Sequence, residues 1–158
     1  MNLFVVFICI TVGTMTGLFF SKRSAARARY FAGLVDLTDE LRRNLMFRKD
    51  KLVVFLSAAK PNEKLLAKHI DGFCRHVNEG GADFLCKGYL KNNELAVVQK
   101  FFLGLGAGDA TTELEALQSH KDNFASIYAK VKASNDRIGA AYTKLGFLAG
   151  LAVGILFI

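Results

Sequence analysis

Apolar and charged positions are separated along this chain of 158 residues. Residues 3–20 form an apolar run of 18 residues without a charge, and residues 145–158 form a second uncharged run of 14 residues. All 21 Lys and Arg and all 14 Asp and Glu lie between them, in residues 22–144. The sequence therefore divides into an uncharged N-terminal segment (residues 1–21), a polar middle and an uncharged C-terminal segment.

The polar middle carries a helical period near both of its ends. In its first half, apolar residues recur every three or four positions, at Tyr30, Leu34, Leu37, Leu41 and Leu45, with Phe31 and Met46 beside them. In its second half, a 4-3 spacing links Leu117, Lys121, Phe124, Tyr128, Val131, Asn135, Ile138, Tyr142 and Leu145. Each stripe predicts one long helix. We expect each helix to continue without a break into the uncharged segment beside it.

Shorter helices are predicted between these two stripes. The single proline, Pro61, precedes a helix over residues 62–77, whose inward positions are Leu65, Leu66, His69, Ile70, Phe73 and Val77. Another helix is predicted over residues 92–103, with Leu95, Val98, Phe102 and Leu103 as its apolar positions. Residues 52–56 are too few for the period to separate helix from strand.

A glycine-rich turn precedes the second long helix. It contains Gly104, Gly106, Gly108 and Asp109. Asp109 or Thr112 can cap the helix that follows, and Thr112 with Glu115 has the spacing of a capping box. The predicted fold class is all-α: a membrane-anchored helical bundle with two long antiparallel stalk helices that continue into terminal transmembrane helices.

The two uncharged segments are the candidate membrane helices. At about 1.5 Å per residue, the N-terminal run covers about 27 Å, close to the roughly 30 Å of a bilayer core. No basic residue precedes it, and Ser21, Lys22 and Arg23 follow it, which disfavours a cleaved signal peptide. The C-terminal run covers only about 21 Å, but Tyr142 and Lys144 form a typical interfacial boundary before it. The positive-inside rule then predicts a two-pass cell-membrane protein with residues 22–144 in the cytoplasm.

Small residues recur at helical spacing in both candidate membrane helices. The first run contains Gly13 and Gly17, and the second contains Gly146, Gly150 and Gly154. Such faces let two helix backbones approach closely in lipid. We expect these glycines to pack the membrane helices together, within one molecule or between copies.

A basic cluster follows the first apolar stripe. Its members are Arg42, Arg43, Arg48, Lys49 and Lys51, and Asp50 is the single acid among them. One interpretation is a helix end near an anionic lipid leaflet. The other is a binding surface for an acidic protein partner, with Arg42, Arg43, Arg48 and Lys49 as the contact residues.

Known chemical motifs are not matched elsewhere in the chain. His69, Cys74, His76 and Cys86 lack the spacing of zinc ligands, so buried thiols and a core histidine are the expected roles. The glycine turn lacks the Lys-Ser/Thr of a phosphate loop. Despite the net charge of +7, the aromatic residues lie on apolar faces and do not alternate with the basic residues, which disfavours nucleic-acid binding. We expect no enzyme activity, no metal and no cofactor.

The order of these features resembles the stage III sporulation protein AB family. The closing pattern Tyr142, Lys144, Leu145, Gly146 and Gly150 is the most specific part, and the turn over residues 105–109 is the second. The similarity is looser over residues 48–92. In the family a Gln usually follows the turn Asp within a few residues, whereas Thr111, Thr112 and Glu113 stand here.

This resemblance implies a membrane protein of the mother cell in an endospore-forming bacterium, within the complex that links it to the forespore. It implies a cytoplasmic domain similar to those of type II secretion and type IV pilus platform proteins. The implied partners are a cytoplasmic secretion-type ATPase and other membrane proteins of the complex. Three alternatives remain open: a structural membrane protein that forms homo-oligomers, a domain that binds anionic membrane lipids through the basic cluster, and an unrecognised enzyme.

Overall fold

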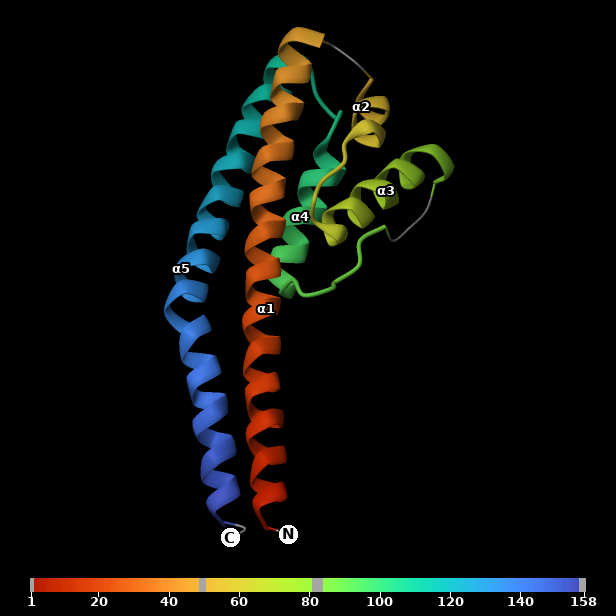
Figure 1. Ribbon diagram of the computed structural model, residues 1–158. Helices are drawn as coiled ribbons and strands as arrows, with labels where there is room; N and C mark the ends of the chain where they lie inside the picture. Colours follow the sequence, from red (N-terminus) through yellow and green to blue (C-terminus); the bar gives the residue numbers. More distant parts are fainter. Residues whose placement is uncertain (1, 49–50, 81–83, 157–158) are drawn as a thin grey trace. The chain divides into compact units, whose positions relative to one another are not determined.

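The computed structural model describes residues 2–48, 51–80 and 84–156 (Figure 1). Near the ends of the long helices it describes the backbone without the side chains, at residues 2–7, 9, 10, 20, 48, 137–140, 142, 143, 146, 147, 150 and 153–156. The elements are α1 (Asn2–Arg43), the π-helix η1 (Asn44–Arg48), α2 (Leu52–Ala58), α3 (Lys64–Glu79), α4 (Asn92–Gly104) and α5 (Ala110–Leu156). The described residues contain no strand, so the predicted all-α class is confirmed.

Two long helices dominate the chain, as the periodicity predicted. α1 has 42 residues and α5 has 47, and each joins an uncharged segment to a polar stripe without a break. The helices predicted at residues 62–77 and 92–103 are confirmed as α3 and α4, and residues 52–56 belong to the short helix α2. α3 ends at Gly80, whose φ of 70° is left-handed and favours glycine.

The chain forms two compact units, which are described separately. Unit 1 contains residues 1–28 and 129–158, and unit 2 contains residues 29–128. The boundaries predicted from charge, after residue 21 and before residue 145, stay a prediction.

Unit 2 is built around one hydrophobic core. The predicted face of α1 is buried at Tyr30, Phe31, Leu34, Leu37 and Leu41, and α5 contributes Leu117 and Phe124. The Phe31 and Phe124 ring centroids are 6.3 Å apart, and Phe124 and Phe101 of α4 are 5.2 Å apart. Large aromatic side chains thus join α1, α4 and α5 within this unit.

Within unit 2, α1 and α5 are antiparallel. Phe31 packs near Phe124, Asp39 binds Lys121, and Leu41 and Leu117 line one cavity. The residue number therefore falls along α5 as it rises along α1 (Figure 1). This agrees with the antiparallel pairing predicted for the two long helices.

One expectation about inward packing was wrong. Val77 was predicted to be inward, but 51% of its surface is exposed. Met46 and Leu103, the apolar residues at the ends of two other predicted stripes, are 46% and 53% exposed. Met46 follows the change from α- to π-helix, and Val77 and Leu103 lie in the last turns of α3 and α4. Thr112 with Glu115 is not the capping pair, because α5 already begins at Ala110 and Asp109 precedes it.

Unit 1 contains the first part of α1 and the last part of α5. Gly17 is buried and Gly13 is partly buried, and Val131 of α5 is also buried. The structure gives no burial for Gly146, Gly150 and Gly154, which lie outside the described side chains. Their predicted packing stays a prediction. Over residues 2–48, 51–80 and 84–156, no helix combines the length and the apolar character of a membrane span. The two predicted membrane helices stay a prediction.

Candidate functional site

The end of α1, the helix α2 and the α4–α5 turn come together at one end of unit 2. They enclose a cavity of about 160 Å³ lined by Leu41, Asn44, Leu45, Leu52, Phe55, Gly106, Glu113 and Leu117. The segments that carry the basic cluster and the glycine turn therefore meet at this cavity, through residues next to the cluster and through Gly106 of the turn. We call this region the α1–α5 tip, consisting of residues 41–47, 51–55 and 104–117.

The glycine turn is fixed by backbone geometry and by two acidic side chains. Gly106 has a φ of 77°, in the left-handed region, and a Cβ there would lie 3.6 Å from Leu52 Cδ2. Its N–H donates to Glu113 Oε1 at 2.7 Å. Asp109 accepts a hydrogen bond from the Thr111 hydroxyl. Hydrogen bonds from Thr111 and Thr112 hold the pKa of the exposed Asp109 carboxyl below its usual value.

Thr111 and Glu113 follow the turn Asp, in the region where the family usually has a Gln. Both make side-chain contacts that order the turn in this chain, through a hydroxyl and a carboxylate. Gly104 and Gly108 have no positive φ in this structure.

The basic cluster is only partly a free surface. Arg43 and Lys51 are exposed, whereas Arg42 is partly buried, with Nη1 3.9 Å from Asp39 Oδ1. Asp39 Oδ1 also lies 2.8 Å from Lys121 Nζ. Arg42 Nε is buried and has no hydrogen-bond partner. Through Asp39, Arg42 thus belongs to the contact between α1 and α5. The side chain of Arg48 and the whole of Lys49 lie outside the described residues.

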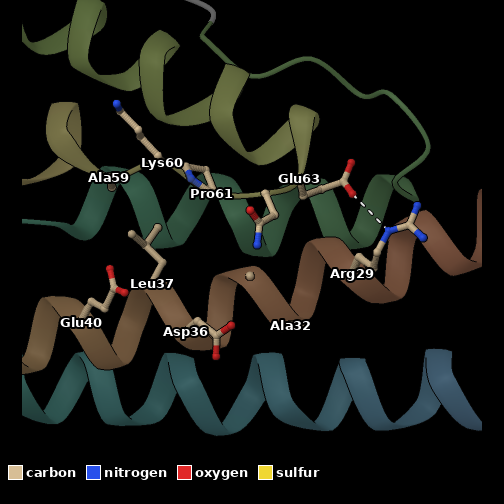
Figure 2. A pocket seen from close by; sticks show the side chains of 11 residues that line it. Arg29, Ala32, Asp36, Leu37, Glu40, Ala59, Lys60, Pro61 and Glu63 are labelled. Atoms are coloured by element: carbon tan, nitrogen blue, oxygen red, sulfur yellow. Dashed lines mark ion pairs between the residues drawn. The ribbon is translucent and has the colours of Figure 1, made fainter.

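A polar groove runs along α1 beside the α2–α3 connection (Figure 2). It measures about 400 Å³ and is lined by Arg29, Ala32, Gly33, Asp36, Leu37, Glu40, Ala59, Lys60, Pro61, Asn62 and Glu63. Figure 2 shows Arg29 facing Glu63, with 3.6 Å between Nε and Oε2. The other Glu63 oxygen accepts a hydrogen bond of 2.6 Å from the Tyr89 hydroxyl. Burial, with Glu63 nearby, raises the pKa of Tyr89 above its usual value.

A buried polar network lies in the core of unit 2. The His69 side chain is fully buried, with Nδ1 2.7 Å from the Tyr30 hydroxyl and Nε2 2.8 Å from the Cys86 carbonyl oxygen. Burial lowers the pKa of His69 and raises that of Tyr30. The expectation of a core histidine is confirmed.

The cysteines differ from each other in exposure. Cys74 is buried as expected, and burial raises the pKa of its thiol. Cys86 is exposed, so the prediction of a second buried thiol was wrong. Over the described part of the chain, no three His, Cys, Asp or Glu side chains are grouped to hold a metal ion.

Sequence reasoning missed the groove, the His69 network and the roles of Tyr89 and Glu63. A histidine within an apolar stripe indicates that a polar partner is buried beside it. The sequence does not say which residue this is, because Tyr30 and Cys86 lie 39 and 17 positions away from His69. The groove had no signal in the sequence, since one wall is α1 and the other is the connection between α2 and α3, more than 15 residues further along the chain.

Over the described residues, the fold defines an all-helical protein with two long helices, each joining an uncharged segment to a polar helical unit. The family model for stage III sporulation protein AB matches residues 2–158. The chain belongs to this family and is a sporulation protein. No match was found among curated proteins or among solved structures.

Proposed function

We propose that this protein is a non-enzymatic membrane component of a secretion-like complex between mother cell and forespore. In this proposal, the α1–α5 tip binds the cytoplasmic secretion-type ATPase of the complex. The observation that carries the proposal is that the end of α1, the start of α2 and the glycine turn meet at one end of unit 2. Arg43 and Lys51 are exposed there and suit acidic side chains of a partner.

The membrane part of the proposal rests on the uncharged segments. Residues 3–20 include no charged side chain, and Lys22, Arg23 and Arg27 follow them. Within this run the Thr11 and Thr16 hydroxyls each donate 2.8 Å hydrogen bonds to backbone carbonyls of their own helix, those of Ile8 and Val12. Such internal pairing removes most of the cost of placing a hydroxyl in hydrocarbon. We therefore propose a two-pass protein of the mother-cell membrane facing the forespore, with unit 2 in the cytoplasm.

The non-enzymatic part is supported by the roles of the titratable core groups. His69, Tyr30, Tyr89 and Glu63 are held in hydrogen bonds and an ion pair that join the helices of unit 2. Groups used in this way stabilise the packing of helices. A platform-like domain of this kind would act by presenting a surface.

The test uses charge reversal at the tip of the full-length protein in detergent. The double variant Arg43→Glu and Lys51→Glu, at the two exposed basic residues of the tip, should weaken binding to the purified ATPase and reduce its dependence on salt, because screened charge contacts are lost. The matched control is Lys68→Glu with Arg75→Glu, the same charge change at exposed positions of α3. It should bind like the wild type.

Other outcomes would redirect the proposal. Equal binding by both double variants would remove the tip from the contact. If the wild-type protein ignores the ATPase but sediments with anionic vesicles in a salt-sensitive manner, the lipid-binding alternative replaces it. Self-association that is lost on substitution of Gly13 and Gly17 would favour the homo-oligomer.

A further inference from the structure

The net charge of the chain is concentrated in unit 1. Its two stretches of sequence, residues 1–28 and 129–158, contain seven Lys and Arg and one acid, Asp136, so they carry +6 of the chain's +7. Unit 2 has fourteen basic and thirteen acidic residues and carries only +1. We call the seven basic residues of unit 1 the basic collar: Lys22, Arg23, Arg27, Lys130, Lys132, Arg137 and Lys144.

Most side chains of the basic collar are exposed. The exposed members are Lys22, Arg23, Lys130, Lys132 and Lys144, Arg27 is partly buried, and the side chain of Arg137 lies outside the described residues. The first part of α1 and the last part of α5 lie side by side in unit 1 (Figure 1), so positive charges from both helices gather on one small unit. One acid can offset only one of seven such charges, so unit 1 attracts anionic groups.

Exposed apolar side chains adjoin the basic collar on both helices. In α1, Phe19 lies three residues before Lys22 and is 64% exposed. In α5, Leu145 and Leu148 come just after Lys144 and are 60% and 58% exposed. Beyond them the sequence carries no charged side chain, in residues 1–21 and 145–158. Each helix of unit 1 thus has an exposed apolar surface directly next to a positively charged one.

A bilayer that contains anionic lipid offers both matching surfaces in the same order. Its hydrocarbon covers apolar side chains, and its phosphate groups lie at the interface, where Lys and Arg side chains reach them. An acidic protein surface would match the charges but would leave the neighbouring apolar side chains in water. The combination therefore favours lipid over an acidic protein as the partner of the basic collar.

We propose that the basic collar binds the phosphate groups of anionic phospholipids, so that these lipids are enriched around unit 1. This inference rests on the membrane part of the proposed function, which places the uncharged segments in the bilayer. It goes beyond that part by naming the lipid class and the residues that select it, and it does not depend on the ATPase contact. Because several charges act together, the selection depends on net charge and on ionic strength.

The experiment measures lipid selection by electron paramagnetic resonance, with the full-length protein reconstituted into phosphatidylcholine vesicles. Traces of spin-labelled phosphatidylglycerol or phosphatidylcholine show a motionally restricted component when the lipid lies next to the protein. The ratio of the two association constants follows from these components. For the wild type, phosphatidylglycerol should be favoured by at least about threefold at low salt. At about 1 M salt, where the Debye length is about 3 Å, most of this preference should disappear.

Variants identify the groups that select the lipid. Lys22→Glu with Lys144→Glu lowers the net charge of unit 1 from +6 to +2 and should remove most of the preference. The matched control, Lys64→Glu with Lys68→Glu, makes the same charge change at exposed positions of α3 and should keep the wild-type ratio. Lys22→Arg with Lys144→Arg retains the charge and should also keep it. An equal restricted fraction of phosphatidylcholine in every variant shows that all of them are inserted.

Each other result decides against a specific part. If neither spin-labelled lipid shows a restricted component with the wild type, the membrane part of the proposed function fails, and this inference fails with it. Equal components for the two lipids would leave the membrane part standing and overturn the basic collar alone. A preference that survives Lys22→Glu with Lys144→Glu, or that is lost in the α3 control, would overturn it as well.

An acidic protein partner is a separate outcome of the same variants. The wild type could show no lipid preference, while Lys22→Glu with Lys144→Glu abolishes binding to a co-reconstituted membrane protein of the complex. In that case the basic collar contacts acidic side chains, and the lipid inference is overturned.

Discussion

His69 is buried and has a hydrogen-bond partner on each ring nitrogen. The Cys86 carbonyl oxygen only accepts, so Nε2 carries the hydrogen and donates across 2.8 Å. Nδ1 therefore accepts from the Tyr30 hydroxyl at 2.7 Å. Burial disfavours the imidazolium form and outweighs the Cys86 carbonyl, which favours it, so the pKa of His69 is lowered.

This arrangement predicts that stability falls in mild acid. The pKa of His69 is lowered in the folded protein from the ordinary value of 6.5, so the unfolded chain binds a proton that the folded chain does not. The free energy of unfolding should therefore be at its full value above about pH 6.5 and decrease as the pH falls below it. Urea unfolding followed by circular dichroism at several pH values measures this slope.

A second histidine contributes in the same direction. The pKa of His120 is also lowered, by burial and by Lys100 nearby. The variant His120→Asn separates the contributions of the two histidines to the free energy of unfolding. It should keep most of the pH dependence of that free energy, because His69 is more deeply buried than His120. If the slope disappears in His120→Asn, His69 is not its source.

Tyr30 provides a test of the same network without a change of pH. In Tyr30→Phe the ring stays in the core, but Nδ1 of His69 loses its donor. A buried acceptor without a partner costs about 1–3 kcal/mol, so the unfolding free energy should fall by that amount. A loss below about 0.5 kcal/mol would indicate that water replaces the hydroxyl.

At the scale of elements, the stripes were predictable and the changes of helix type were not. The α1 face from Tyr30 to Leu41 and the helices α3 and α4 followed from apolar spacing, because each buries one continuous face. The π-helix at Asn44–Arg48 depends on packing around Asn44 and Leu45, which spacing does not encode. The basic cluster and the glycine turn were both recognised in the sequence. Their adjacency could not be, because it arises from tertiary packing across more than 50 residues of sequence.

Two phenylalanines of opposite exposure test the packing of α5 on α1 and α4. Phe124 is fully buried between Phe31 and Phe101, so Phe124→Ala should destabilise the protein by about 3–5 kcal/mol. Phe47→Ala removes the same atoms from an exposed position and should change stability by less than about 0.5 kcal/mol. Denaturant midpoints compare the two directly. Similar values for both variants would contradict the core assignment.

In unit 1, the glycines predict a close helix pair. Nine residues separate Gly13 from Lys22 and eight separate Ala152 from Lys144, about 13.5 and about 12 Å at the helical rise. Cys introduced at Gly13 and Ala152, with the native Cys replaced, should form an intramolecular disulfide in membranes. Gly17→Ile should abolish it, at a cost of about 1–2 kcal/mol of helix contact. Crosslinks only between two chains would assign the glycines to oligomer contacts.

At the scale of the whole molecule, the distribution of charge predicts the topology. All Lys and Arg lie in residues 22–144, so this region should be cytoplasmic and both ends should be on the opposite side. In spheroplasts, a Cys at Asn2 should react with a membrane-impermeant maleimide. A Cys at Asn93, an exposed position of α4, should react only after lysis. Reaction at Asn93 in intact spheroplasts would overturn this topology.

The most direct test of the account joins its membrane and docking claims in one measurement. The full-length protein is reconstituted into lipid nanodiscs, and binding of the purified secretion-type ATPase is measured at low and high ionic strength, with empty nanodiscs of the same lipid as reference. We predict binding to the loaded nanodiscs alone, strong at low salt and weakened at high salt as the charges of the tip are screened. Equal binding to loaded and empty nanodiscs at low ionic strength, or none to either, would contradict the account.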